Sequence, residues 1–297
     1  MNASHEFMAA IQAAGLEPPE HIEPGRLYRF PGAGKRNSNT AAWCRLFEDG
    51  EGGVFGDWST GLSATWRAKQ DKPRSPAERA EFARQVKTAR FAVDADRKER
   101  QALAAERAKR IWAEAKPAPK GFPYLENKRI RAYDARIHNS ALVLPVGDFE
   151  GLTSLQFING DGSKRLLPGG RKKACFIPVQ RPQLPSRRVI VCEGWATGST
   201  LAEDDPEATV LAAIDAGNLE AVAVAIRAHW PKSEIVIAGD DDRKTKSNPG
   251  RAAANKAAVA ANALIAFPQF PEGAPADLSD FNDLAVYLAS QQKGEAA

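Results

Sequence analysis

The pattern of apolar and polar residues changes several times along the chain. Between residues 23 and 66, short apolar runs such as RLYRF, AAWCRLF and GGVFGDW are separated by glycine-rich turns. Brief apolar runs between turn residues are typical of strands. This part of the sequence therefore predicts a small β-rich module.

A long helix is predicted to follow. Ser75 supplies an N-cap hydroxyl, Pro76 suits the first helical position, and Glu78 can close a capping box. Alanine, arginine and glutamate then dominate to about residue 115, and we expect one helix there with a break near Val93. The prolines at 117 and 119 end it.

Residues 141–179 carry the apolar stretches ALVLPV, LTSLQFI and ACFIPV, which are separated by Gly-Asp and Gly-Gly turns. Basic residues lie between these stretches. The pattern predicts an antiparallel β unit with cationic turns.

From residue 188 the pattern becomes an alternation of strands and helices. RVIVC, ATVLAAI and EIVIAG are predicted strands, and the segments between and after them are predicted helices, one capped by Asn218. Such alternation predicts a parallel α/β sheet with ligands at the carboxyl ends of its strands.

The expected fold class is α/β, mixed α+β over the whole chain. Its expected parts are a small β-rich module, a long basic helical linker, a basic β subdomain, and a parallel sheet flanked by helices with a C-terminal helix. They cover residues 1–70, 75–117, 118–186 and 187–297.

Composition narrows the class of protein. In 297 residues, 43% are hydrophobic, enough for a sizeable core, and 26% are charged, as in ordinary soluble proteins. No apolar run is long enough for a membrane span, and the start of the chain lacks a secretory signal, so we expect no membrane contact. The three cysteines, Cys44, Cys175 and Cys192, are far apart. They allow no disulfide framework, and we expect a cytoplasmic protein with free thiols.

The net charge of +4 conceals a partition. Residues 67–131 have a net charge of +10 and residues 132–189 of +5, whereas residues 190–297 have a net charge of −8. A basic centre suits phosphates, and clustered carboxylates suit divalent metals. A basic solvated helix beside an acidic surface explains the same charges.

Three acids stand at predicted strand ends. Glu193 follows one strand, and Asp240 and Asp242 follow another. Because carboxyl ends of parallel strands meet at one edge, these carboxylates can converge and bind Mg²⁺ or Mn²⁺. A metal there can neutralise a reacting phosphate and lower the pKa of an attacking oxygen. Solvated acidic turns remain an alternative.

These residues resemble a known domain. VIVCEG at 189–194, IVIAGDDD at 235–242 and the Gly250 that opens an Ala-rich helix are similar to a Toprim domain, shared by bacterial-type primases, topoisomerases and some nucleases. Upstream, YLENKRI and the segment from LVLPVGDFEG to KRLLPGG resemble primases of plasmids and phages. FGDWSTG and SDFNDL resemble elements of the same proteins. The similarity extends from about residue 25 to 290.

The resemblance implies roles for particular residues. Glu193 becomes a metal ligand or a general acid/base, and Asp240 and Asp242 become metal ligands, with Asp241 pointing elsewhere. Lys164 and Arg165 match a basic pair that holds nucleotide phosphates or template. Further residues are candidates for nucleotide or DNA binding, namely Arg171, Lys172, Arg243 and Lys244. Asp280 and Asp283 are additional candidates for metal binding, although Ser279 can cap a final helix there and the acids can stabilise its dipole.

Two features depart from familiar patterns. Bacterial-type primases usually carry an N-terminal zinc ribbon, but Cys44 stands alone with only His21 within reach, so we expect no zinc. PGAGKR at 31–36 lacks the first glycine and the final Ser or Thr of a P-loop, so we assign no ATPase or helicase activity.

The sequence thus predicts a DNA primase of a mobile element. We expect it to synthesise short primers on single-stranded DNA from nucleoside triphosphates, with a separate replicative helicase as a partner. A Toprim nuclease that activates water is one alternative, and a non-catalytic DNA-binding or replisome-adaptor protein is another. A topoisomerase would need a strand-passage domain for which this length leaves no room.

Overall fold

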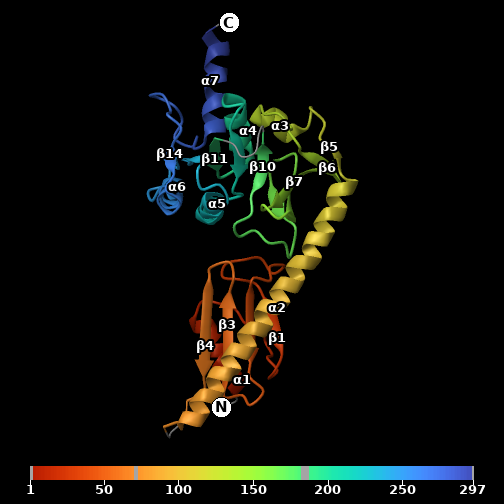
Figure 1. Cartoon of the computed structure of the whole chain (residues 1–297), viewed down its shortest axis with the longest axis vertical. Coiled ribbons are helices and arrows are strands. Elements are labelled where there is room, and N and C mark those ends of the chain that lie inside the picture. The colour runs from red at the N-terminus through yellow and green to blue at the C-terminus, as the bar shows by residue number, and fades with distance from the viewer. Residues whose placement is uncertain (1–2, 70–72, 182–186, 296–297) are drawn as a thin grey trace. The chain divides into compact units, whose positions relative to one another are not determined.

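The computed structural model describes residues 3–69, 73–181 and 187–295, apart from the last three side chains of this range. Contacts between Cα atoms group the chain into two compact units, Met1–Glu99 and Arg100–Ala297. The expected four-part division is not decided by this grouping and stays a prediction. Each unit is described by itself (Figure 1).

The first unit is built on a four-stranded antiparallel sheet, as the apolar runs predict. The strands follow the chain order, β1 (Leu27–Phe30), β2 (Ala42–Leu46), β3 (Gly52–Asp57) and β4 (Leu62–Arg67). Helix α1 (Ala3–Ala13) packs Phe7 and Ile11 against one face, and helix α2 (Pro76–Glu114) packs Ala89 and Val93 against the other. Both faces of the small sheet are therefore covered by apolar contacts.

Helix α2 is continuous over 39 residues. Its start is the predicted capping box, because Glu78 N donates to Ser75 Oγ (3.2 Å) and Ser75 N donates to Glu78 Oε2 (2.6 Å). The predicted break near Val93 is wrong, since Val93 is buried against the sheet inside an uninterrupted helix. Near the other end of the helix, Ala108 is buried in an apolar cluster of the second unit.

Cys44 lies in the apolar core between the sheet and α1. Burial raises the pKa of its thiol to about 12, which disfavours the thiolate that a zinc site needs. His21 is exposed, with its Nε2 atom 3.9 Å from Glu23. These residues do not fit a zinc ion.

The PGAGKR segment is a structural loop. Asp57, fully buried, accepts hydrogen bonds from Ala33 N and from the backbone and hydroxyl of Ser59. A Cβ atom on Gly32 would lie 2.7 Å from Asp57 Oδ2, so this position requires glycine. The loop is thus shaped around a carboxylate of its own unit.

The second unit begins with the predicted antiparallel sheet. It contains β5 (Lys116–Pro117), β6 (Arg136–His138), β7 (Ala141–Gly147), β8 (Leu152–Ile158) and β9 (Lys164–Leu166), in that order, and helix α3 (Pro123–Lys128) lies between β5 and β6. The ACFIPV segment was expected in this sheet, but its strand β10 (Ile177–Gln180) pairs with β12 of the next sheet. An isolated bridge between Gly147 and Phe176 connects the two sheets.

The next sheet has the order β10-β12-β11-β13-β14 and is parallel except for β10. Its other elements are β11 (Arg188–Cys192), α4 (Trp195–Asp204), β12 (Thr209–Ala212), α5 (Ala216–His229), β13 (Glu234–Ala238), α6 (Pro249–Ala261), β14 (Leu264–Ala266) and α7 (Phe281–Glu295). Helices α5 and α6 cover one face, while α4 and side chains of β7 and β10 pack on the other. The predicted mixed α/β fold is confirmed.

Asn218 does not cap α5, whose N-cap is Asp215. Its buried side chain instead accepts from Ala174 N and donates to the carbonyl oxygens of Cys175 and Ala213. The segment before β10 is thereby fastened to the end of β12. Both N–H donors and the oxygen of this buried amide therefore have hydrogen-bond partners.

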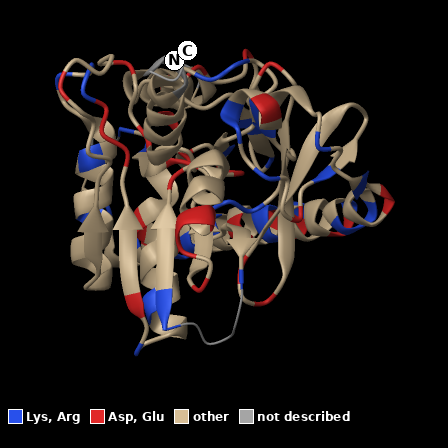
Figure 2. Cartoon of the chain, turned by 90° about the horizontal axis from the view of Figure 1, so that it is seen from above, with Lys and Arg blue, Asp and Glu red and all other residues tan. Residues whose placement is uncertain are grey.

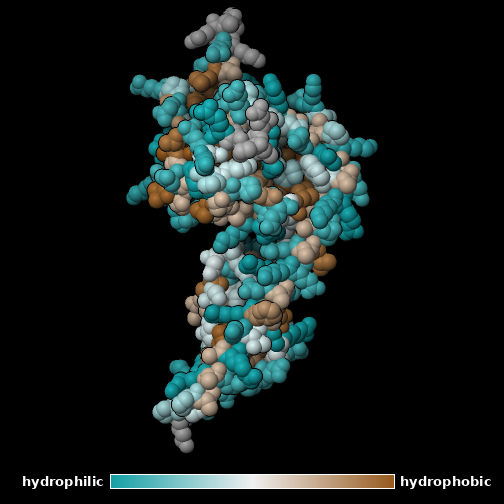
Figure 3. All heavy atoms as spheres, in the orientation of Figure 1, coloured by the Kyte–Doolittle hydropathy of each residue, from teal (hydrophilic) through white to brown (hydrophobic). Residues whose placement is uncertain are grey.

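Hydrophobic residues are scattered in small groups between hydrophilic ones on the face of the molecule drawn in Figure 3. No helix in the described ranges is both long enough and apolar enough to cross a bilayer.

Candidate active site

Glu193 and Asp240 emerge from two adjacent parallel strands. Cys192 and Ala238 are paired in register at the carboxyl ends of β11 and β13, and the two acids follow immediately behind. Figure 2, in which Asp and Glu are red, shows acidic segments beyond the arrowheads of strands. The sheet therefore brings together two acids that are 47 positions apart, as the sequence pattern predicts.

Asp240 is the most perturbed carboxylate in this place. Its pKa is raised from 3.8 to about 8, chiefly by burial and then by the negative charges of Glu193, Asp280, Asp242 and Asp283. Its Oδ1 atom is buried and has no hydrogen-bond partner. A desolvated carboxylate with an unused oxygen among four others is poised to take up a cation or a proton.

Glu193 and Asp242 flank Asp240 with partly engaged carboxylates. Burial raises the pKa of Glu193, although its carboxylate accepts from the backbone of Ala216 at the start of α5. Asp242 Oδ2 accepts from Gly250 N (2.8 Å) in the first turn of α6. Both acids thus lie at helix N-termini, where the backbone stabilises negative charge.

Asp280 and Asp283 contribute to the site from the start of α7, near the end of the domain in sequence. Asp280 Oδ1 accepts from Asp283 N (2.7 Å), so Asp280 and not the expected Ser279 caps α7. Asp241 N donates to Ser279 O (2.7 Å), which holds this segment beside the DDD sequence. Burial and the charge of Asp283 raise the pKa of Asp280. Asp280 and Asp283 also interact electrostatically with the site, because both raise the pKa of Asp240.

Asp241 points away from this group, as expected. Its carboxylate accepts from Arg251 Nε (2.7 Å) and Nη2 (3.1 Å) and from Asn248 Nδ2 (2.7 Å). Hydrogen bonds from Arg251 lower its pKa. Asp241 therefore holds the DDD loop against α6 and leaves Asp240 and Asp242 as the functional candidates.

The residues fit a divalent cation by charge. No three His, Cys, Asp or Glu side chains in the described ranges already form a set that could hold a metal ion, so the predicted trio is not a preformed chelate. Magnesium commonly binds one or two carboxylates and keeps several waters or substrate oxygens. The orphaned oxygen of Asp240, with Glu193 and Asp242 beside it, matches that mode.

The predicted basic pair is divided by the pleat of β9. Lys164 faces the acids, since Glu193, Asp240 and Asp280 all act on its pKa. That pKa is nevertheless lowered, first by desolvation of the ammonium group and then by Lys128, although the residue as a whole is exposed. Arg165 lies over the ring of Phe157, with its Cζ atom 4.2 Å from the ring centroid, on the other face of the sheet. Only Lys164 is brought to the acidic site.

Three of the other four predicted basic residues have structural partners. Arg171 forms an ion pair with Asp148, and Lys172 Nζ lies 2.7 Å from Asp215 Oδ2. Arg243 donates to the carbonyl oxygens of Pro275 (2.7 Å) and Leu278 (3.2 Å) and lies over the ring of Phe270. Lys244 is exposed on the same loop. Their roles in nucleotide or DNA binding stay predictions.

Lys128 is the site residue that sequence reasoning missed. Its ammonium lies 3.1 Å from Asp283 Oδ1, and its charge acts on both Asp280 and Lys164. It belongs to YLENKRI, a segment that resembles primases but whose residue types alone do not indicate a site. Nothing in the spacing of residues 155 positions apart indicates that they meet.

The sheet order and the acidic strand ends define a Toprim domain, and residues 188–290 match the family model of that name. These residues therefore form a Toprim domain, as the sequence resemblance implied. The chain is 33% identical over 307 aligned residues to a DNA primase TraC of Escherichia coli, with 96% of this chain and 20% of that protein covered.

A second DNA primase TraC of Escherichia coli is 33% identical over 280 residues and covers 90% of this chain and 26% of that protein. The chain thus spans about a fifth to a quarter of the length of these relatives. The solved primase fragment of the bacteriophage T7 primase-helicase protein is 14% identical, with a TM-score of 0.42, over 91% of this chain and 98% of that one. The expected likeness to primases is confirmed by the two TraC proteins.

Proposed function

We propose that this chain is the catalytic part of a DNA primase, which joins nucleotides into short primers on single-stranded DNA. The main support for this proposal is the environment of Asp240. Its carboxylate is desolvated, and one oxygen has no hydrogen-bond partner. Four other carboxylates raise its pKa, and Lys164 faces this acidic group. Similarity to the TraC primases along nearly the whole chain supports the same activity.

Asp240, Glu193 and Asp242 would hold a divalent cation, Mg²⁺ or Mn²⁺. When bound, such a cation lowers the pKa of an attacking hydroxyl and reduces the negative charge of the reacting phosphate. Lys164 binds the triphosphate and orients its α-phosphorus toward the 3′ hydroxyl. Glu193, whose pKa is raised by burial, accepts the proton of that hydroxyl while the 3′ oxygen bonds to the α-phosphorus and pyrophosphate leaves.

The basic half of the chain supports a polyanionic template. Residues 67–131 and 132–189 have net charges of +10 and +5. Template binding is therefore expected to weaken steeply with salt. A separate replicative helicase as a partner and a cytoplasmic location stay predictions within this proposal.

Incubation with labelled ribonucleotides, single-stranded DNA and Mg²⁺ or Mn²⁺ tests the function. We expect labelled primers from the wild type and none from Asp240→Asn, with unchanged synthesis in the matched variant Asp277→Asn, an exposed acid outside the site. If the end-labelled template is cut into fragments and no primers form, the proposed function would be nuclease activity instead of primer synthesis. Primer synthesis that is the same in wild type, Glu193→Gln and Asp240→Asn would refute the proposed catalytic site.

A further inference from the structure

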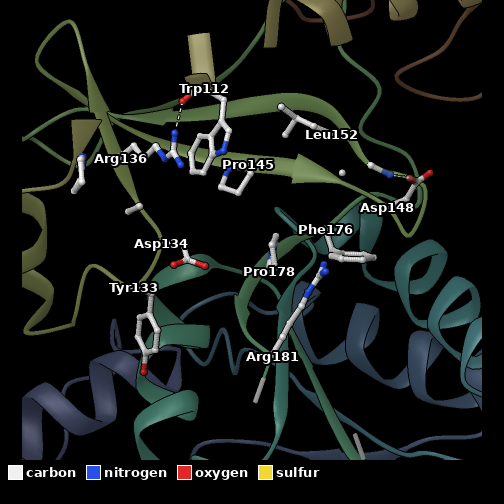
Figure 4. A pocket seen from close by; sticks show the side chains of 14 residues that line it. Trp112, Tyr133, Asp134, Arg136, Pro145, Asp148, Leu152, Phe176, Pro178 and Arg181 are labelled. Carbon is white, nitrogen blue, oxygen red and sulfur yellow. Dashed lines mark hydrogen bonds between the residues drawn. The ribbon is translucent and has the colours of Figure 1, made fainter. Parts of the chain in front are cut away.

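A hollow lies within the second unit, apart from the residues of the acidic site. Its volume is about 630 Å³, and its walls come from the end of α2, the segment before β6, the β7–β8 hairpin and β10 (Figure 4). None of the acids of the candidate active site lines it, nor does Lys164 or Lys128. Its lining includes the aromatic side chains of Trp112, Tyr133 and Phe176 and the charged side chains of Asp134, Arg136 and Arg181.

Flat side chains form much of the wall. The Arg136 guanidinium lies over the indole of Trp112, with its Cζ atom 4.2 Å from the ring centroid, and Nη1 donates to the Trp112 carbonyl oxygen (2.6 Å). Tyr133 is fixed by a hydrogen bond from its hydroxyl to Ser199 O (3.2 Å). Prolines 145 and 178 lie between these rings and Phe176 (Figure 4). Fixed flat surfaces of this kind suit a planar aromatic ligand.

The charged side chains that line the hollow differ in whether they form an ion pair. Asp148 is neutralised by its ion pair with Arg171. Arg181 lies over the ring of Phe176, 5.6 Å from the centroid, and forms no ion pair with a carboxylate in the described ranges. Its side chain is exposed where it lines the hollow, so its charge is accessible to an anionic partner.

One carboxylate remains available. Asp134 is exposed at the wall and forms no ion pair with any described residue. A carboxylate of this kind accepts hydrogen bonds from the exocyclic amino groups of bases, as acidic side chains do with cytosine. Thymine lacks such an amino group, so the hollow has a means of distinguishing bases.

We propose that this hollow binds single-stranded nucleic acid, with a base against Trp112, a backbone phosphate at Arg181 and a base amino group at Asp134. The proposal deepens the proposed function and rests on it for the biological source of the strand. The template and the newly made primer share the required chemistry. The hollow would then hold a strand at a place separate from the reacting atoms.

Binding of fluorescein-labelled decanucleotides, measured by anisotropy with the full chain in EDTA, tests this site without the metal. We expect the affinity for oligo(dC) to exceed that for oligo(dT), and Arg181→Ala to weaken both by about tenfold. The matched control is Arg187→Ala, an exposed arginine that does not line the hollow, which should change affinity less than about twofold. Oligo(rC) compared with oligo(dC) identifies the primer or the template as the preferred source.

Two more variants separate the contacts from the fold. Trp112→Phe should retain binding and Trp112→Leu should lose it, with melting temperatures recorded for both because Trp112 also packs on the sheet. Asp134→Leu should remove the preference for dC over dT. Equal affinities of wild type and Arg181→Ala overturn the site, as does a dC preference that survives Asp134→Leu. Equally tight binding of free CMP would show a mononucleotide pocket and overturn the strand proposal.

The variant Asp240→Asn keeps this test independent of catalysis. It should make no primers but bind the decanucleotides as the wild type does. If the protein makes primers normally but Arg181→Ala does not weaken strand binding, only the proposal of a strand-binding hollow is overturned. Strand binding that depends on Arg181, in a protein that makes no primers, would overturn only the proposed function.

Discussion

Lys164 and Arg165 are consecutive residues of β9, yet their side chains lie on opposite faces of the sheet. Lys164 Nζ is 5.9 Å from the ring centroid of Tyr124 on the Toprim side, and the Arg165 guanidinium covers Phe157 on the side of α2. The two-residue period of a strand imposes this separation. Of the two basic residues that are adjacent in the sequence, only Lys164 therefore faces the acidic site.

The first prediction follows from that separation. Lys164→Ala should raise the KM for nucleoside triphosphates by about tenfold or more, because a charge-assisted hydrogen bond contributes about 1.5–3 kcal/mol. Arg165→Ala, its neighbour in sequence, should change KM less than about threefold. Steady-state primer synthesis measures both, and equal losses from the two variants would contradict the structure.

The second prediction concerns pH. The pKa of Asp240 is raised from 3.8 to about 8 in the folded protein, so the folded state keeps a proton that the unfolded chain loses above about pH 4. The free energy of unfolding of the metal-free protein should therefore fall by a few kcal/mol as the pH rises from about 4 to about 8. Urea denaturation in EDTA across this range measures the slope.

Asp240→Asn should remove much of that slope, because the amide does not ionise. Asp277→Asn, an exposed control, should preserve it. Added Mg²⁺ should raise the stability of the wild type most at the alkaline end, where the carboxylates are charged. An identical slope in wild type and Asp240→Asn would contradict the raised pKa of Asp240.

The third prediction gives two neighbouring acids opposite effects on stability. Asp241→Asn removes a charge that is paired with Arg251 and hydrogen-bonded to Asn248, so it should lower the free energy of unfolding by about 1.5–3 kcal/mol. Asp240→Asn should raise it at pH 8, since an uncompensated buried charge disappears. Melting curves at one pH compare them, and a loss of stability in both variants would be inconsistent with this arrangement.

The fourth prediction concerns the pair that closes the site from α3 and α7. Lys128 and Asp283 are about one third and one fifth exposed, so their coupling should be modest. A double-mutant cycle with Lys128→Met and Asp283→Asn should give about 0.5–1 kcal/mol. Strictly additive effects would mean that the pair does not persist in solution.

Much of the Toprim domain follows from sequence alone. The apolar runs at 188–192 and 234–238 form adjacent parallel strands, and the acids after them meet because parallel strands end at one edge. The capping box at Ser75 and Glu78 is equally local, since its two hydrogen bonds join residues three apart. Patterns within one element, or between elements of a regular sheet, can be predicted from the sequence.

Contacts between distant segments were decided by the tertiary structure alone. The ACFIPV strand leaves its hairpin neighbours for β12, Val93 is held in a helix by a sheet far away in sequence, and Lys128 meets Asp283 across 155 positions. Residue types and spacing fix which face of a helix or strand is apolar, but they do not say which other surface covers it. That choice depends on packing of the whole chain, and it also determines which charges lose water and so become reactive.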